Sequence, residues 1–392
     1  MNPDTRPIYL DYNASTPIDP AALETMVSVL RDEYGNPSSQ HHSRGRKASD
    51  IIENARRQTA QLIHASPSEI IFTSGATESC NLAIKGAAAA YREKGNHIIT
   101  SMAEHKAVLQ PLKQLANHDF DITFLRPDAF GRAAPEQIEA AMTERTILVC
   151  VMAANNVLGT LNPIADIARR CKKRGVLFFS DTTQAAGKLP LDVEQTGLDL
   201  ASLSAHKMYG PKGTGALYVR SSGPRVRLEP QILGGGQERG LRGGTENVAG
   251  IAGMGAACEL AERLLADESE RVAGLRERFE KEILKTISGV EIIAGGVARL
   301  PNTTMLTVSD VRAERLLRAL SADLAASTGS ACDSAGGDSN YVLKAIGLEQ
   351  DKIAGAIRFS LGRFTTPDAI ADAVTALSRE IGLLRNEARQ GG

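Results

Sequence analysis

The sequence lacks an excess of either charge, a long apolar run and a signal peptide. Its 45 Lys and Arg face 46 Asp and Glu, for a formal net charge of −1, so no long-range field draws the whole molecule to nucleic acid or to an anionic membrane. It contains no uninterrupted run of about 18 apolar residues, and its first residues, MNPDTRPIYLDYN, lack the apolar segment of a signal peptide. We therefore expect a cytoplasmic protein without membrane contact or direct nucleic-acid binding.

Cysteine is scarce and poorly spaced for structural roles. The five cysteines form no CxxC pair and have no histidine at ligand spacing beside them, so a disulfide framework is disfavoured and we expect no metal. Four lie in apolar or helix-like runs, which predicts buried, unreactive thiols: Cys80, Cys150, Cys171 and Cys258. Cys332 differs, because its surroundings, STGSACDSAGGDSN (327–340), hold nothing large and apolar. We expect an exposed, mobile loop there.

The motifs of the common nucleotide-binding sites are also absent. No P-loop and no GxGxxG occurs, so nucleoside triphosphates and dinucleotides lose their usual support. An apolar fraction of 42% and a charged fraction of 23% are ordinary for a folded, globular chain. With 392 residues, we expect two domains or one large and one small domain.

Between residues 70 and 220, short β-rich runs alternate with helical patterns. The runs are EIIFTS, HIITS, DITFLRP, TILVCVM, GVLFFSD, LASLS and GALYVR. This alternation is typical of an α/β sheet covered by helices, in which reactive residues collect after the carboxyl ends of the strands. After residue 250 the spacing of Val272, Leu275, Phe279 and Ile283 predicts one long amphipathic helix, followed by a smaller α+β unit.

Three segments hold the parts that a pyridoxal phosphate site requires. FTSGATESCNLAIKG (72–86) places Gly75 between a strand and a helix, where free N–H groups suit a phosphate. FFSDTTQAAGK (178–188) ends a strand with Asp181, and LSAHKMYGPKG (203–213) ends another with Lys207 before a constrained turn. A lysine for the Schiff base, a carboxylate for the pyridine nitrogen and a phosphate cradle together predict this cofactor.

At this point the chain resembles the pyridoxal-phosphate-dependent cysteine desulfurases of the NifS/IscS type. The motifs that carry the resemblance span nearly the whole chain in order: YLDYNAST (9–16), GNPSS (35–39), FTSGATES (72–79), EHKAVL (104–109), NNVLGT (155–160), DTTQAAGK (181–188), SAHKMYGPKG (204–213), GGGQERGLRGGTEN (234–247), TGSAC (328–332) and IRFSLGRFTT (357–366).

The resemblance implies fold type I of the pyridoxal-phosphate-dependent transferases. The large α/β domain would cover residues 16–260, with a mostly parallel seven-stranded sheet covered by helices. A smaller α+β domain would comprise residues 1–15 and 261–392 and carry both the catalytic cysteine loop and the substrate-binding Arg358. A homodimer is implied as well.

The resemblance also implies a role for each site residue. Lys207 would form the Schiff base, Asp181 would pair with the pyridine nitrogen, and Cys332 would be the nucleophile that accepts sulfur. His105 would stack on the ring and move protons, and Gln184 would bind the ring oxygen. Further cofactor contacts would come from Ala76, Thr77, Asn156, Ser204 and His206, with Thr245 supplied by the second subunit, and the substrate would be held by Asn36, Asn156 and Arg358.

These parts support the conversion of L-cysteine to L-alanine, with the sulfur left as a persulfide on Cys332 for a protein acceptor, such as an iron–sulfur scaffold or a sulfur carrier. A selenocysteine lyase and a cysteine sulfinate desulfinase are the enzyme alternatives, and a non-catalytic dimeric scaffold is the alternative from another class.

The run RRCKKR (169–174) is interpreted as the end of a helix rather than a nucleic-acid patch, because cations complement the dipole there. Asp333 departs from the family pattern, and a carboxylate beside the nucleophile opposes thiolate formation.

Overall fold

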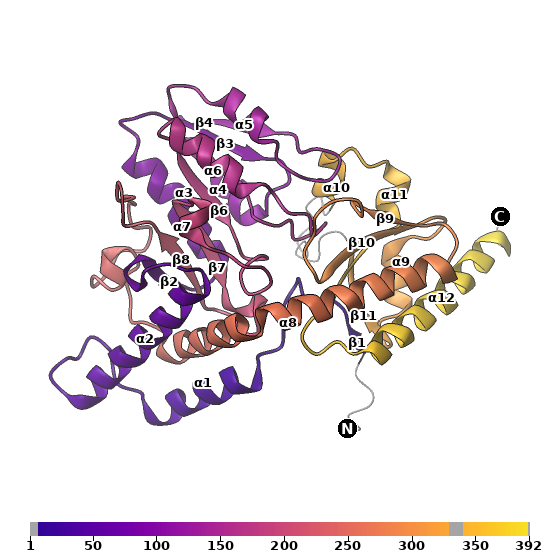
Figure 1. Ribbon diagram of the computed structural model, residues 1–392, viewed down its shortest axis with the longest axis horizontal. Coiled ribbons are helices and arrows are strands. Elements are labelled where there is room, and N and C mark those ends of the chain that lie inside the picture. Colours follow the sequence, from indigo (N-terminus) through magenta and orange to yellow (C-terminus); the bar gives the residue numbers. More distant parts are fainter. Residues whose placement is uncertain (1–6, 329–339, 391–392) are drawn as a thin grey trace.

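The computed structural model describes residues 7–328 and 340–390. Figure 1 shows a larger lobe built on one sheet and a smaller lobe built on another, with a single long helix running beneath both. That helix is α8 (Val248–Thr286), 39 residues long, and it confirms the long amphipathic helix predicted from the spacing of apolar residues. Within the described ranges, no helix is both long and apolar enough to cross a membrane.

The sheet of the larger lobe has seven strands among the described residues, in the order β2-β8-β7-β6-β5-β3-β4. The five strands from β3 to β7 pair in parallel, whereas β8 is antiparallel to both of its neighbours. The strands are β2 (Ile70–Thr73), β3 (His97–Ser101), β4 (Asp121–Leu125), β5 (Thr146–Cys150), β6 (Leu177–Asp181), β7 (Leu200–Ser204) and β8 (Gly215–Val219). The predicted mostly parallel sheet is confirmed, and each strand lies where an apolar run stands in the sequence.

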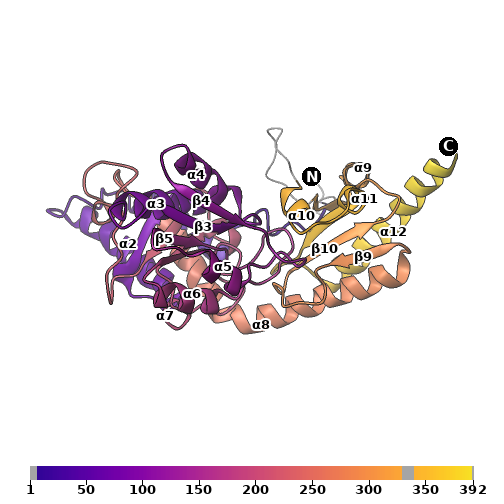
Figure 2. The same ribbon diagram turned by 90° about the horizontal axis from the view of Figure 1, so that it is seen from above.

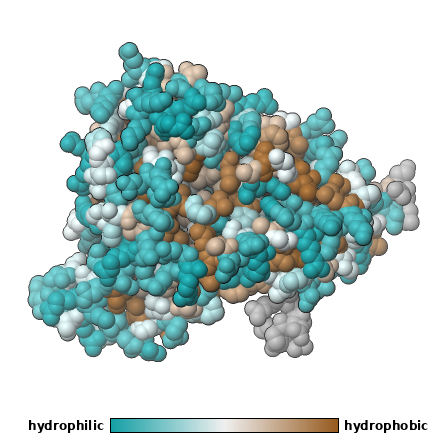
Figure 3. All heavy atoms as spheres, viewed as in Figure 1, coloured by the Kyte–Doolittle hydropathy of each residue, from teal (hydrophilic) through white to brown (hydrophobic). Residues whose placement is uncertain are grey.

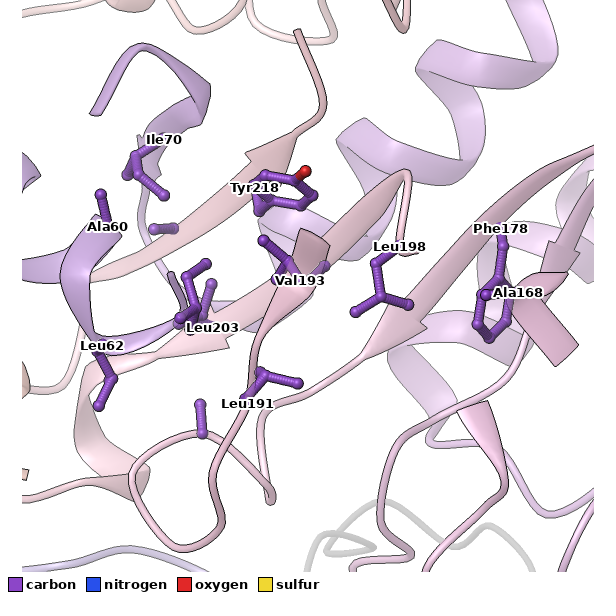
Figure 4. Packing of buried hydrophobic residues seen from close by; sticks show 14 of the residues in the cluster. Ala60, Leu62, Ile70, Ala168, Phe178, Leu191, Val193, Leu198, Leu203 and Tyr218 are labelled. Atoms are coloured by element: carbon purple, nitrogen blue, oxygen red, sulfur yellow. The ribbon is translucent and has the colours of Figure 1, made fainter. Parts of the chain in front are cut away.

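Helices cover both faces of this sheet because successive side chains of a buried strand point to opposite sides. Phe178 packs into a core formed with α2, α6 and α8, and the next residue, Phe179, packs into a second core formed with α3 and α4. Figure 4 shows part of the first core, in which Phe178, Leu203 and Tyr218 lie on the sheet. The remaining helices of this lobe are α1 (Pro20–Asp32), α2 (Ser43–Leu62), α3 (Ala76–Ala90), α4 (Lys106–Ala116), α5 (Pro135–Ala141), α6 (Ile164–Lys173) and α7 (Val193–Thr196), with short 3-10 turns η2 (Pro67–Glu69), η3 (Ala205–Lys207) and η4 (Glu238–Gly240).

The basic run after residue 168 lies at the end of α6, as predicted. The last turn of that helix carries Arg170, Lys172 and Lys173, where the helix dipole favours cations. Arg170 is also engaged by Glu136 and Glu139 on α5. The run therefore joins two neighbouring helices.

The smaller lobe is an antiparallel sheet in the order β12-β13-β10-β9. Figure 2 shows this sheet lying beside the larger one, with α8 passing under both. Its core is formed with the second half of α8 and with α12. The elements are β9 (Val290–Ile293), β10 (Thr303–Val308), α9 (Ala313–Ala319), β11 (Leu324–Ala325), β12 (Ser327–Thr328), α10 (Tyr341–Ala345), α11 (Gln350–Ala354), β13 (Ala356–Ser360) and α12 (Pro367–Gln390).

The N-terminal segment returns to this smaller lobe. The short strand β1 (Ile8–Tyr9) pairs in parallel with β11, and Leu10 packs into the smaller lobe's core. Along α8 the packing changes between Ala261, which belongs to the first core, and Val272, which belongs to the smaller lobe's core. The division into residues 16–260 and residues 1–15 with 261–392 stays a prediction, and this packing is compatible with it.

Candidate active site

Two neighbouring parallel strands of the larger sheet end in residues that the sequence singled out. β6 ends at Asp181, which pairs in register with Ser202 of β7. β7 ends at Ser204 and leads directly into η3, whose last residue is Lys207. The fold therefore brings the predicted carboxylate and the predicted lysine to the same edge of the sheet.

The carboxyl group of Asp181 is buried and firmly oriented. Its Oδ1 accepts hydrogen bonds from the Ser202 hydroxyl at 2.8 Å and from the Thr183 N–H at 3.0 Å. The residue is 7% exposed. One donor lies on β7 and the other lies two residues after the end of β6, so these two strands and the turn after β6 set the orientation of this carboxyl group.

Lys207 is oriented by the N-terminal segment. Its Nζ donates to the main-chain oxygens of Asn13 at 2.6 Å and Ala14 at 2.7 Å. The same oxygen of Asn13 accepts from Nε2 of Gln184 at 3.0 Å. Asn13 thus joins two predicted cofactor residues, although 194 positions separate it from Lys207 in the chain.

Asn13 also reaches the predicted substrate residues. Its Nδ2 donates to the Asn156 carbonyl at 3.3 Å and to the Thr303 hydroxyl at 2.8 Å, and the residue is 2% exposed. The Asn156 carbonyl accepts from Arg358 as well, at 3.0 Å. The sequence assigned no role to Asn13, although it lies in the motif YLDYNAST. Asn13 could have been identified from its place in this polar motif, which begins in the short apolar N-terminal strand.

Arg358 points away from the smaller lobe's own core. Its neighbours on β13, Ile357 and Phe359, pack into that core, so alternation directs Arg358 to the opposite face. There its guanidinium donates to Asp11 Oδ1 at 2.7 Å and to the carbonyl of Asn156, a residue of the larger lobe's loop after β5. Its Nε is buried without a protein partner.

His206 lies beside Lys207 and is held neutral. Burial, followed by the positive charges of Lys207 and Lys212, lowers the pKa of its imidazole to about 4. Its Nδ1 lies 3.2 Å from the hydroxyl of Ser15. A neutral imidazole here can still serve as a hydrogen-bond donor to an anion.

The start of α3, where the sequence predicts a phosphate site, has open space at its N-cap. Gly75, the N-cap of this helix, has φ of 147°, and a Cβ built on it would meet nothing within 4 Å. The N–H groups of Ala76 and Thr77, in the first turn of the helix, have no acceptor within the helix and are donors that suit a phosphate. On the other side, a Cβ on Gly215 of β8 would lie 2.6 Å from Cα of Gly75, so only glycine allows this close approach.

His105 is the N-cap of α4, and its tautomer follows from that contact. Its Nδ1 accepts from the Ala107 N–H at 3.1 Å, so the neutral ring carries its proton on Nε2.

The preceding Glu104 is 1% exposed, and burial holds the pKa of its carboxyl well above the usual range. Its main-chain oxygen accepts from the Tyr341 hydroxyl at 2.7 Å, which ties this loop to α10. The sequence assigned no role to Glu104 or Tyr341.

Two predicted residues lie apart from the others, and a third is outside the described part of the chain. Asn36 is exposed in the segment between α1 and α2, and its Oδ1 accepts from the Ser38 N–H at 2.9 Å. Figure 1 shows this segment at the lower left. Thr245 is exposed just before α8. Cys332 lies outside the described residues. Their roles stay predictions.

The other four cysteines are buried, as predicted, each with a relative exposure of 0%. Burial raises the pKa of the Cys171 and Cys258 thiols to about 12, and holds those of Cys80 and Cys150 well above the ordinary value. A thiol that stays protonated is a poor nucleophile. None of these four is suited to accept sulfur.

The residues present fit pyridoxal phosphate. The open space over Gly75 matches a phosphate, and Asp181 and Lys207 stand at adjoining strand ends. Oδ1 of Asn156, whose main-chain oxygen accepts from Asn13 and Arg358, is buried without a protein partner, which leaves an acceptor for a bound molecule. The site would hold the group with its phosphate at α3, its ring nitrogen toward Asp181 and its aldehyde carbon at Lys207.

Comparison with known proteins agrees with this arrangement. The model of the family "Aminotransferase class-V" matches residues 8–372. A relative from Anaeromyxobacter sp. (strain K), named cysteine desulfurase IscS, is 48% identical over 379 residues, which cover 97% of this chain and 93% of the relative.

Two solved structures are similar over most of their length. A NifS-like protein has a TM-score of 0.89 and 36% identity, covering 96% of this chain and 99% of its own. A structure titled SspA in complex with cysteine has a TM-score of 0.80 and 38% identity, covering 91% and 99%. The family model covers nearly the whole chain, and the relative from Anaeromyxobacter is 48% identical to it. The chain therefore belongs to the aminotransferase class-V family of pyridoxal-phosphate-dependent enzymes.

Proposed function

We propose that the chain is a cysteine desulfurase, which converts L-cysteine to L-alanine and retains the sulfur as a persulfide on Cys332. The observation that carries the proposal is the hydrogen-bonded chain through Asn13. It joins Lys207 and Gln184, on the cofactor side, to Asn156 and Arg358, on the substrate side. A lysine and a carboxylate-binding arginine held in one network are what an amino-acid substrate needs.

Arg358 would bind the carboxylate of cysteine. The guanidinium is fixed by Asp11 and Asn156, and Nε has no protein partner, so donors remain for a ligand. A planar fork of N–H groups suits a carboxylate. Because the side chain is only 3% exposed, an ion pair formed there is little screened by water.

Pyridoxal phosphate, when bound, supplies an electron sink that loosens the Cα proton and weakens the carbon–sulfur bond of cysteine. The chain's own groups then orient and move protons. Lys207 would take the Cα proton at Nζ, and His105 would hold a proton at Nε2 for transfer. Asp181 would keep the ring nitrogen protonated through its buried carboxylate.

The sulfur step needs a thiolate, and Cys332 is the thiol assigned to it. The thiolate attacks the substrate sulfur, so a sulfur–sulfur bond forms while the carbon–sulfur bond breaks. The electron pair of the broken bond remains with the substrate, and a returning proton completes alanine. Cys80, Cys150, Cys171 and Cys258 are unsuited to this step because they are buried and their pKa values are raised.

A homodimer is part of the proposal. Thr245 would reach the phosphate of the second subunit, and its side chain is exposed in the single chain. Leu23, Val27 and Leu30 lie on one face of α1 and are 47%, 41% and 66% exposed, which is unusual for adjacent large apolar residues. Figure 3 shows apolar surface over this helix at the lower left. A second copy would cover it.

Delivery of the persulfide sulfur to a protein acceptor, and a cytoplasmic location, belong to the same proposal. An iron–sulfur scaffold or a sulfur-carrier protein is the expected class of acceptor. The name of the IscS relative and the full-length likeness to it support this choice.

The deciding experiment is to incubate the purified holoenzyme with L-cysteine and a reductant. Alanine and sulfide should form in equal amounts, and without reductant a persulfide should be found on the Cys332 peptide. Parallel reactions with selenocysteine and cysteine sulfinate distinguish the alternative lyases by their relative rates. Bound pyridoxal phosphate with no product from any of the three substrates would favour the non-catalytic scaffold.

A further inference from the structure

Lys188 contacts the predicted cofactor residue Gln184 directly. The main chain after β6 forms a helical turn, in which the N–H groups of Ala186 and Lys188 donate to the carbonyls of Thr182 and Ala185. Side chains four residues apart on such a turn lie on the same side. Nζ of Lys188 donates to Oε1 of Gln184 at 2.6 Å.

The Gln184 amide is held from both ends by partners of opposite kind. An ammonium only donates, so the oxygen of the amide must face Lys188. A main-chain carbonyl only accepts, so the nitrogen must face Asn13, whose oxygen lies 3.0 Å away. A flipped amide would place N–H against N–H at one end and oxygen against oxygen at the other.

The nitrogen end is the one directed to the site. The Asn13 oxygen that receives Nε2 of Gln184 also receives Nζ of Lys207, so both nitrogens converge on one atom. An amide nitrogen carries two hydrogens, and Asn13 uses one. The second is available to a neighbouring acceptor beside Lys207.

We propose that Lys188 is a positioning residue that locks the Gln184 amide with its nitrogen toward Lys207, so that Gln184 meets the ring oxygen of pyridoxal phosphate only as a donor. The ring oxygen is negatively charged in the reactive cofactor, so a donor stabilises it and a carbonyl oxygen would repel it. This inference rests on the proposed function, because that reading places Gln184 at the ring oxygen.

The electrostatic setting of Lys188 fits a polar task better than a packing task. Burial, with Lys207 and Arg358 adding positive charge and Glu268 opposing them, lowers the pKa of its ammonium to about 7. If this position only had to be filled, methionine, which has a similar length, would fill it without the cost of burying an ammonium. The neutral amine still has N–H groups that can donate to Gln184, and the Asn13 carbonyl, which only accepts, fixes the nitrogen at the other end of the amide.

The test compares Lys188→Met with the wild-type holoenzyme through retention of pyridoxal phosphate on dilution and through the absorption spectrum of the bound cofactor. We expect the dissociation constant to rise about tenfold, the value of one hydrogen bond to a charged group, and the spectrum to shift because the ring oxygen loses a fixed donor. Lys188→Arg retains donors and should stay near wild type. Lys172→Met, an exposed lysine on α6, is the matched control and should change neither readout.

A double-mutant cycle then decides whether Lys188 acts through Gln184. In a Gln184→Met background, adding Lys188→Met should change cofactor retention by less than about twofold, because the amide to be oriented is gone. An equal tenfold loss in both backgrounds would overturn the inference, as would a Lys188→Met holoenzyme with unchanged retention and spectrum. If Lys188→Met does not fold, the Lys188→Leu variant, which also has no donor, replaces it in the same cycle.

Failure of the proposed function gives a different result. A wild-type protein that binds no pyridoxal phosphate would refute that function and the inference together. A protein that binds the cofactor and shows the expected cycle, yet makes no alanine from cysteine, would refute only the activity.

Discussion

Replacement of Arg358 by lysine tests the substrate side of the site with the least disturbance to the fold. Lysine retains the positive charge, so the half-buried Asp11 carboxylate, now 2.7 Å from the guanidinium, keeps a charged partner. What lysine cannot keep is the planar fork that contacts Asp11 and Asn156 while leaving further donors for a ligand. The change therefore removes geometry rather than charge.

The expected size of the effect follows from the lost contact. A hydrogen bond to a charged group contributes about 1.5–3 kcal/mol. Because the charge itself is retained, the lower end applies. Since about 1.4 kcal/mol corresponds to a factor of ten, the affinity for an amino-acid carboxylate should fall about tenfold.

Two measurements are needed, because a Michaelis constant reports binding only when chemistry is slow. The dissociation constant of L-alanine, measured by calorimetry on the holoenzyme, reports carboxylate binding without turnover. The Michaelis constant for L-cysteine, from alanine formation, should rise by a similar factor.

The matched control is Arg363→Lys, five residues further along the chain. Arg363 donates to Asp19 at 2.6 Å and to Glu268 at 2.7 Å, and it stacks on Tyr209. Its replacement should lower the melting temperature and leave both constants unchanged. An unchanged dissociation constant for L-alanine in Arg358→Lys would remove Arg358 from the substrate site.

Four further predictions concern single residues of the site. Lys207→Ala should abolish alanine formation while the far-ultraviolet circular dichroism spectrum is unchanged; alanine at the normal rate would contradict its role. Asp181→Asn should slow turnover roughly 10- to 100-fold at full cofactor occupancy, because an amide retains hydrogen bonds but not charge. Cys332→Ser should still bind cofactor and L-alanine yet form almost no alanine from cysteine, and labelled sulfur on any other cysteine peptide would contradict the assignment. His206 has a pKa lowered from 6.5 to about 4 by burial, so the cofactor-free protein should lose stability as pH falls from 6.5 to 4, where only the unfolded chain binds the proton; His206→Gln should flatten that part of the pH profile in denaturant unfolding.

Much of the fold could be predicted because it depends on local patterns. Each apolar run between residues 70 and 220 became a strand of the larger sheet, and the spacing of Val272, Leu275 and Phe279 marked α8. Burial of four cysteines followed from the apolar character of their neighbours. Hydrophobic periodicity needs only the sequence, since it reflects which face of an element is buried.

The chemical parts of the site could also be recognised from the sequence. Asp181 and Lys207 each follow an apolar strand, and parallel strands place their carboxyl ends at one edge. The resemblance supplied the roles of Arg358, His105 and Gln184. The roles of all these site residues, and those of Asn36, Thr245 and Cys332, stay predictions.

Only the tertiary structure decided how these parts are connected. Asn13 orients Lys207 from 194 positions away, and Arg358 meets Asp11 across 347 positions, so neither contact leaves a local pattern in the sequence. The orientation of the Gln184 amide likewise depends on having Lys188 at one end and Asn13 at the other. The sequence by itself determined the elements and the reactive residue types, because these depend on neighbours along the chain. The three-dimensional fold decided which groups hold them in place, because hydrogen bonds depend on distance in space.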